Sequence, residues 1–202
     1  VTITQQLDAN LDWTSFQLGT IAFGSHTVTV PAGLMSYNTT VSVSDTLNVN
    51  IVANFDAATG LLTYTFTSIE PTTGDIPSGA LDGFLPPADA AGDGYGYVTY
   101  TVNPKAGLST GATINAQASI VFDNNAAINT PNVLNTIDAA APSSTITALA
   151  ATQSGANISL TWSGSDDAGG SGIANYSIYV SVDGSDYAIW QTTSATAALF
   201  PA

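Results

Sequence analysis

Positive charge is almost absent from this sequence of 202 residues, whose only lysine or arginine is Lys105. Fifteen acidic residues oppose it and leave a formal net charge of −14 at pH 7. Because nucleic acids are bound through clustered Lys and Arg side chains, we expect no nucleic-acid partner. An anionic membrane surface is disfavoured for the same reason.

Cysteine is missing altogether, and so are long hydrophobic runs. The first absence excludes a disulfide framework, a thiolate metal site and a cysteine nucleophile. Although 45% of the residues are hydrophobic, Thr, Ser, Asn, Gly and Pro interrupt every run before the roughly 20 apolar residues that a spanning helix needs. We therefore expect no membrane insertion.

Residue types that carry catalysis are also scarce. The single histidine, His26, lies in the alternating segment His26–Val30, and no serine stands in the context of a nucleophile elbow. With one glutamate and no arginine, no pair of carboxylates is singled out for glycoside hydrolysis. The sequence therefore predicts a protein that is not an enzyme.

Period-two alternation dominates the sequence that is present. In Leu62–Thr67, large apolar residues alternate with Thr, which places them on one face of a strand. No window of about 11 residues carries a helical stripe with caps at both ends. Residues 1–138 are thus predicted to form an all-β sandwich. Its predicted strands are Val1–Leu7, Trp13–Leu18, His26–Val30, Tyr37–Val43, Leu47–Phe55, Leu61–Ser68, Tyr95–Val102, Thr113–Phe122 and Val133–Ile137.

A segment without a pattern follows this region. Residues 139–144 consist of Ala, Pro and Ser and predict a linker, so a second domain is expected at 145–202. The fold prediction is therefore an all-β chain of two β-sandwich-type domains. Strands of the second domain are predicted at Thr145–Ala151, Ile158–Trp162, Asn175–Val182, Tyr187–Gln191 and Ala195–Phe200.

Two stretches of the second domain resemble strands B and C of a fibronectin type III-like domain. They are Ser159–Gly164, with Trp162 as the buried aromatic of strand B, and Ser171–Gly184. The first domain is similar to a repeat module of large secreted bacterial surface proteins. The segments that carry this likeness are Gly83–Pro87, Gly96–Val102, Ile120–Asn125 and Asn135–Asp138. Both resemblances imply a cell-surface or matrix building block and imply no catalytic residues.

Acidic side chains gather in predicted turns, and Ca²⁺ is the cation that such oxygen-rich loops suit. Asp8, Asn10 and Asp12 alternate as at the start of an EF-hand loop. Trp13 stands where that loop needs Gly, and Gly19 where it needs Glu. An EF-hand is therefore excluded, whereas a simpler Asp-x-Asn-x-Asp site stays a prediction.

Three further turns supply candidate Ca²⁺ ligands, which are Asp89, Asp93, Asp123, Asn125, Asp166 and Asp167. The first two lie in a long loop that follows a pair of prolines, and the next two directly follow a strand. The last two are adjacent like charges between the predicted strands B and C, and a cation would relieve their repulsion. A solvated turn is the alternative at each place.

Few Lys and Glu residues, with abundant Thr, Asn, Gly and Ala, are typical of secreted bacterial surface proteins. We therefore expect an extracellular or cell-surface structural module, such as an adhesin, matrix component or filament subunit. It is expected to self-associate through strand edges and to be stabilised by Ca²⁺. The alternative is a carbohydrate-binding accessory module of a secreted enzyme, and a third hypothesis is a fragment of a secreted hydrolase. Aromatic residues available for sugar stacking are Trp13, Trp162, Trp190, Tyr95, Tyr97 and Tyr100.

The second domain is short for the resemblance it carries. About 60 residues leave room for five of the about seven strands of such a sandwich, so strands F and G are missing. Strand C, at Tyr176–Val180, is then expected to have an unpaired edge beside Trp162. The chain begins within a strand pattern and without Met, which predicts a mature or excised segment. Either the polypeptide continues beyond Ala202, or Val1–Leu7 of a neighbouring subunit fills the gap by strand complementation.

Overall fold

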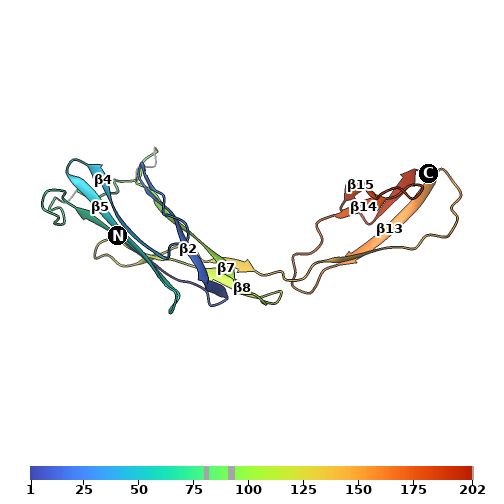
Figure 1. Cartoon of the computed structure of the whole chain (residues 1–202), viewed down its shortest axis with the longest axis horizontal. Coiled ribbons are helices and arrows are strands. Elements are labelled where there is room, and N and C mark those ends of the chain that lie inside the picture. Colours follow the sequence, from blue (N-terminus) through green and yellow to red (C-terminus); the bar gives the residue numbers. More distant parts are fainter. Residues whose placement is uncertain (80–81, 91–93, 202) are drawn as a thin grey trace. The chain divides into compact units, whose positions relative to one another are not determined.

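The computed structural model describes residues 1–79, 82–90 and 94–201, whose only regular elements are β-strands (Figure 1). The predicted all-β class is therefore confirmed. These residues contain no helix with the length and apolar character that crossing a membrane requires. The strands are β1 (Thr2–Gln6), β2 (Leu11–Phe23), β3 (His26–Val28), β4 (Ser36–Ser44), β5 (Leu47–Asp56), β6 (Leu61–Ile69), β7 (Gly96–Pro104), β8 (Thr113–Ala116), β9 (Ser119–Val121), β10 (Ile128–Asn129), β11 (Val133–Thr136), β12 (Ser143–Ile146), β13 (Asn157–Ser165), β14 (Tyr176–Val180), β15 (Ala188–Thr193) and β16 (Ala197–Pro201).

The chain divides into two compact units. Unit 1 contains Val1–Leu108 and Thr113–Asn135, and unit 2 contains Ser109–Ala112 and Thr136–Ala202. The division falls close to the predicted boundary at residue 138. The short segment 109–112 belongs with unit 2 because Gly111 N–H donates to the carbonyl of Ile137 and Ile137 N–H donates to the carbonyl of Ala112.

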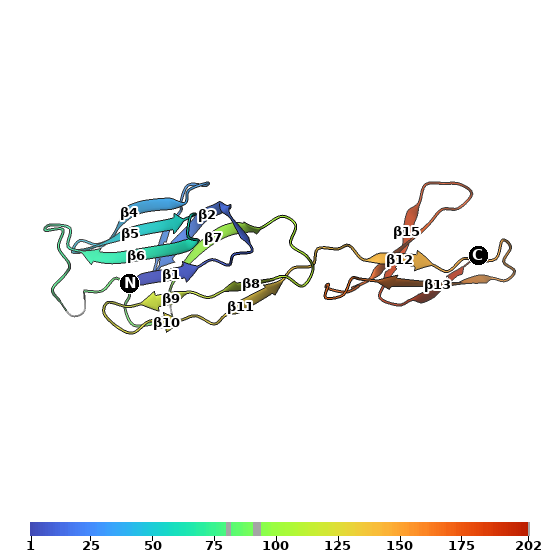
Figure 2. The ribbon, with the colours of Figure 1, turned by 90° about the horizontal axis from the view of Figure 1, so that it is seen from below.

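Unit 1 is a sandwich of two antiparallel sheets. Its larger sheet has the strand order β10-β9-β1-β6-β5-β4, and its smaller sheet has the order β3-β2-β7 (Figure 2). Strands β8 and β11 form a separate pair. The rings of Phe16 in β2 and Phe55 in β5 stack with centroids 4.0 Å apart, so the two sheets meet through their apolar faces.

The alternation in the strands decides which side chains enter this core. In β5 and β6 the buried residues are every second one, and they include Val49, Ile51 and Tyr64, each with no exposed surface. The Tyr64 hydroxyl donates to the carbonyl of Thr99 in β7, 3.3 Å away. Burial raises the pKa of the Tyr64 phenol to about 12. On the opposite, solvent-facing side, the paired residues Thr63 and Asn54 are polar and uncharged.

Strand β1 lies inside the larger sheet and not at its edge. Thr2–Gln6 pairs with β6 on one side, and Thr2–Thr4 pairs with β9 on the other (Figure 2). Both edges of this strand are therefore used within the same chain. Donation of Val1–Leu7 to a neighbour would require the strand to leave both of these partners.

Unit 2 contains a three-stranded sheet, β12-β13-β16, and a two-stranded sheet, β14-β15. The predicted linker 139–144 is wrong at its end, because Ser143 and Ser144 pair with Ser165 and Gly164 as the start of β12. The two sheets meet face to face: the rings of Trp162 in β13 and Tyr176 in β14 lie 6.3 Å apart. Those of Trp190 in β15 and Phe200 in β16 lie 5.1 Å apart.

Candidate cation site

Three carboxylates of unit 2 converge at one end of its three-stranded sheet. They belong to Asp138, which precedes β12, and to Asp166 and Asp167, which follow β13. One oxygen atom from each lies within 4.8 Å of the others. Because β12 and β13 pair in antiparallel register from Ser143 to Ser165, the residues before one strand and after the other come to the same end.

The loop after β13 folds around its own carboxylates. Gly172 N–H donates to Asp166 Oδ2 at 2.6 Å, and Asp167 N–H donates to Asp166 Oδ1 at 3.0 Å. A Cβ atom on Gly170 would lie 2.7 Å from Asp166 Oδ2 and from Asp167 Oδ1. Glycine at this position therefore lets the two carboxylates approach the loop backbone.

Asp138 is tied to the same loop from the other side. Ser171 N–H donates to Asp138 Oδ2 at 2.8 Å. Hydrogen bonds from the Ser171 hydroxyl and main-chain N–H lower the pKa of the Asp138 carboxyl. The described residues of unit 2 include no lysine or arginine that would oppose the negative charge of the three carboxylates.

This donor set suits a hard cation. Ca²⁺ takes six to eight oxygen ligands, and three carboxylates with nearby loop carbonyls and water supply that type of ligand. The sequence pattern indicates Asp166 and Asp167 as ligands but not Asp138. No local pattern marks Asp138, because its neighbours in the sequence are Ile137 and a run of alanines, and only the pairing of β12 with β13 brings it to the loop.

The Asp8, Asn10 and Asp12 side chains turn to different partners. Asp8 accepts the backbone N–H of Asn10 on Oδ1 and that of Asn115 on Oδ2, both at 2.9 Å. These two bonds lower the pKa of the Asp8 carboxyl. The Asn10 amide donates to the carbonyl of Thr113, and Asp12 Oδ1 accepts the hydroxyl and N–H of Thr14. Asp8 therefore joins the β1–β2 turn to β8 as a structural residue.

Asp89, Asp123 and Asn125 belong to unit 1, whereas the group of three carboxylates belongs to unit 2. Asp123 has a positive φ of 51° in the exposed turn after β9, where Asn125 N–H donates to the carbonyl of Phe122. Asp89 is exposed and lies in the segment 82–90. Asp93 lies outside the described residues. Across the described ranges, Asp138, Asp166 and Asp167 are the group of three or more acidic or histidine side chains close enough to hold one ion.

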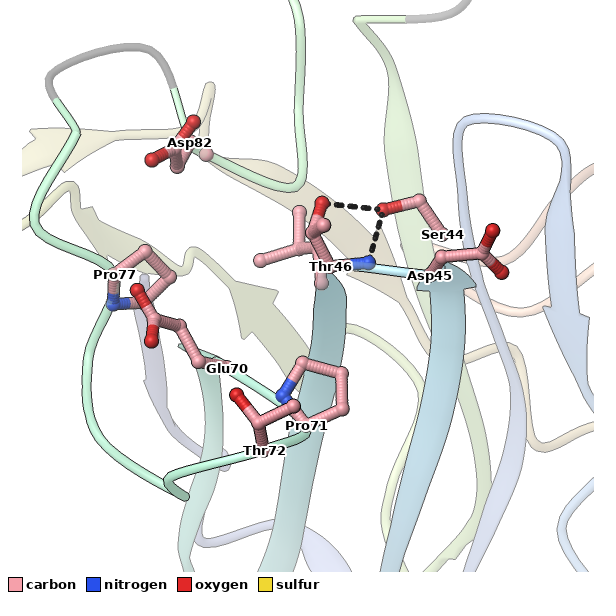
Figure 3. Close-up of a pocket in the computed structure, with 10 residues that line it drawn as sticks. Ser44, Asp45, Thr46, Glu70, Pro71, Thr72, Pro77 and Asp82 are labelled. Atoms are coloured by element: carbon pink, nitrogen blue, oxygen red, sulfur yellow. Dashed lines mark hydrogen bonds between the residues drawn. The ribbon is translucent and has the colours of Figure 1, made fainter.

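Unit 1 has a pocket of about 530 Å³ between the β4–β5 turn and the segment after β6 (Figure 3). Asp45, Glu70 and Asp82 line it together with hydroxyl residues and prolines. The carboxylates of Asp45 and Glu70 point in different directions, so they form no common cation site (Figure 3). The lining contains no aromatic residue on which a sugar ring would stack.

Most of the aromatic residues named from the sequence are used in packing. Trp162 is buried, Tyr100 stacks on Phe16 with centroids 5.3 Å apart, and Trp190 contacts Phe200. Tyr95 and Tyr97 are instead more than half exposed. His26 stacks on Phe23 with centroids 5.5 Å apart.

Comparison with known proteins adds one match. Residues 82–136 match the family described as Domain of unknown function (DUF7619), which covers less than half of the chain. The matched stretch includes β7 to β11 and ends at the boundary between the two units. No curated protein and no solved structure matches the chain.

Proposed function

We propose that this chain is a structural module of an extracellular bacterial protein, such as an adhesin, matrix component or filament subunit. In this proposal the module self-associates through β-strand edges, is stabilised by Ca²⁺ and has no catalytic activity. The observation that carries the proposal is the open outer edge of β4, at the end of the six-stranded sheet. Its nine residues contain no charge and no proline.

An edge of this kind is unusual in a protein that stays monomeric. Soluble β proteins commonly protect edge strands with Lys, Pro or a bulge, because unpaired N–H and C=O groups recruit other strands. In β4 the one irregularity of register lies at the end of the strand, between Ser42 and Ser44, and Ser36–Ser42 pairs regularly. In a chain of net charge −14, two copies repel each other except where their carboxylates are far apart. The uncharged edge of β4 supports self-association at this place, and it takes over the role that the sequence analysis gave to Val1–Leu7.

Charging the edge of β4 is expected to weaken this association. Asn38→Asp together with Thr40→Asp should lower the association constant at least tenfold, because two carboxylates would flank the joining strand. Sedimentation velocity over a concentration series measures it. The matched control is Thr65→Asp with Thr67→Asp, which adds the same charge to the same face two strands away. A monodisperse monomer at high concentration, with and without Ca²⁺, would contradict self-association.

Calcium is expected to raise the melting temperature of unit 2. Binding to the folded state alone at millimolar Ca²⁺ should raise it by about 5–10 °C relative to EDTA. Asp166→Asn should abolish the shift, because it removes charge from the group of three carboxylates. Asp186→Asn is the control, since Asp186 lies in the same unit outside that group. Superimposable melting curves in EDTA and Ca²⁺ would rule the site out.

A carbohydrate-binding module is the second candidate, and one observation favours it. The exposed rings of Tyr95 and Tyr97 lie at and beside the start of β7, where sugar rings have access to them. Binding on a glycan array that is lost on changing both tyrosines to alanine would support this function over the structural one.

A further inference from the structure

The two sheets of unit 2 differ in width, and this leaves one strand without a counterpart. The ring contacts place β13 opposite β14 and β16 opposite β15. Strand β12 is hydrogen-bonded to the other side of β13 and therefore lies opposite no strand. Ile146 of β12 pairs with Trp162 and shares its inward face, yet 53% of its surface is exposed.

A groove marks the vacant position. It has a volume of about 260 Å³ and is lined by β12, β13 and β14, including Ile146, Trp162, Tyr176 and Ile178. The groove lies along the edge of β14 that does not face β15, and β14 pairs with no other strand of the described ranges. Alternate residues of β14 consequently point their N–H and C=O groups into this open side.

The core of unit 2 is small without a further element. Among the described residues of this unit, the buried hydrophobic side chains are Leu160 and Trp162, which are 9% and 6% exposed. The indole Nε1 of Trp162 is buried and has no hydrogen-bond partner. Buried N–H groups normally have an acceptor, so this group marks a place where the packing is incomplete.

We propose that the edge of β14 and this groove accept one extended, uncharged polypeptide strand from outside residues 1–202. The strand pairs with β14 through its main chain and places aliphatic side chains, at every second position, against Ile146 and Trp162. An occupant that pairs with an unpaired strand edge needs N–H and C=O groups at the spacing of a β-strand, and a small apolar molecule lacks them. The main-chain carbonyl groups of the strand are also hydrogen-bond acceptors, and Trp162 Nε1 lacks an acceptor.

The chemistry of the lining decides the charge of the occupant. No acidic or basic residue lines the groove, although the chain carries fifteen acidic residues. A charged side chain buried there would lose its hydration without gaining a counter-charge. A strand of alternating Val and Thr residues is uncharged and has an aliphatic side chain at every second position. Its Val residues would face the groove and its Thr residues the solvent.

A labelled nine-residue peptide of alternating Val and Thr, blocked at both ends, tests this inference on the whole chain by fluorescence anisotropy. We expect saturable binding at least tenfold tighter than that of a peptide with the same composition in blocks. Ile178→Asp should weaken binding at least tenfold, because it puts a charge in the groove. Ile189→Asp should change binding less than twofold, since Ile189 belongs to the same hairpin but does not line the groove.

Hydrogen exchange of the unaltered chain provides a second measurement that needs no variant. With the alternating peptide bound, the amides of β14 that face away from β15 should exchange at least tenfold more slowly. Protection of β4 alone, or equal binding of the two peptides, would overturn the proposal in favour of general edge pairing or a simple apolar pocket. Protection of β14 that grows with protein concentration in the absence of peptide would make a second copy the occupant, and would overturn it as well. Each outcome is independent of whether the β4 edge self-associates.

Discussion

Replacing Gly60 with alanine is expected to lower the free energy of unfolding of unit 1 by about 2–5 kcal/mol. Gly60 closes the turn after β5 with a φ of +74°, a backbone conformation in which an L-residue is strained. An added Cβ would also lie 2.6 Å from the Cε2 and Cη2 atoms of the Trp13 ring. The cost therefore combines about 1–2 kcal/mol of backbone strain with about 1–3 kcal/mol of overpacking.

The Trp13 ring is not free to move away from this methyl group. Its Nε1 donates to the carbonyl of Asp8 at 3.1 Å, and the carbonyl of Gly60 accepts the N–H of Leu7 at 2.9 Å. Turn and ring are thus both held by the segment between β1 and β2. Urea unfolding followed by circular dichroism measures the loss.

Gly33→Ala is the matched control for Gly60→Ala. Gly33 has a φ of +81°, but a Cβ at this position would meet nothing within 4 Å. Its replacement should cost only the strain of the backbone, about 1–2 kcal/mol. Equal losses for the two variants would show that the contact between Trp13 and Gly60 contributes nothing beyond the turn.

Trp162→Ala is expected to remove most of the stability of unit 2 while leaving the stability of unit 1 unchanged. Removing a buried Trp costs about 3–5 kcal/mol, and Trp162 is only 6% exposed in a unit that buries few other side chains. Natural domains are stable by about 5–15 kcal/mol, and a small core places unit 2 at the low end of that range. The loss should therefore consume most of its stability.

Hydrogen exchange resolves the two units within one molecule. In the Trp162→Ala variant, the amides of β13 should lose their protection, whereas those of β5 should keep it. Trp190→Ala provides the comparison, because Trp190 is only half-buried and contacts the edge strand β16. It should cost less than half as much as Trp162→Ala. Unchanged protection of β13 in the Trp162→Ala variant would place the core of unit 2 elsewhere.

The sequence predicted the strands well because alternation is a local property. Leu62, Tyr64 and Phe66 are buried in β6, as the pattern of large apolar residues and Thr indicates. The ends of the strands were less well predicted. Strand β2 runs from Leu11 to Phe23, well beyond the predicted Trp13–Leu18, and the predicted strand Thr113–Phe122 divides into β8 and β9. Hydrogen bonds to other strands decide where a strand begins and ends, and a single segment does not encode them.

The candidate cation site shows the same division. The adjacent charges of Asp166 and Asp167 indicate a candidate site in the sequence by themselves. Asp138 joins them only through the register of β12 and β13, which sets the distance between residues far apart in the chain. The turn at Asp8 shows the reverse. Its spacing is like that of an EF-hand loop, but the Asp8 carboxylate accepts the backbone N–H groups of Asn10 and Asn115, which belong to different segments.

Composition and alternation alone determined that this protein is an acidic, all-β chain without thiols, and which side chains face inward. The tertiary structure decided which strands are neighbours. Val1–Leu7 could have been an edge strand or a donor strand by its sequence, but it lies between β6 and β9. Likewise β14 carries the alternation of a paired strand and has one edge open. The physical reason is that main-chain hydrogen bonds are the same for every sequence, so partner choice follows from the long-range packing of whole faces.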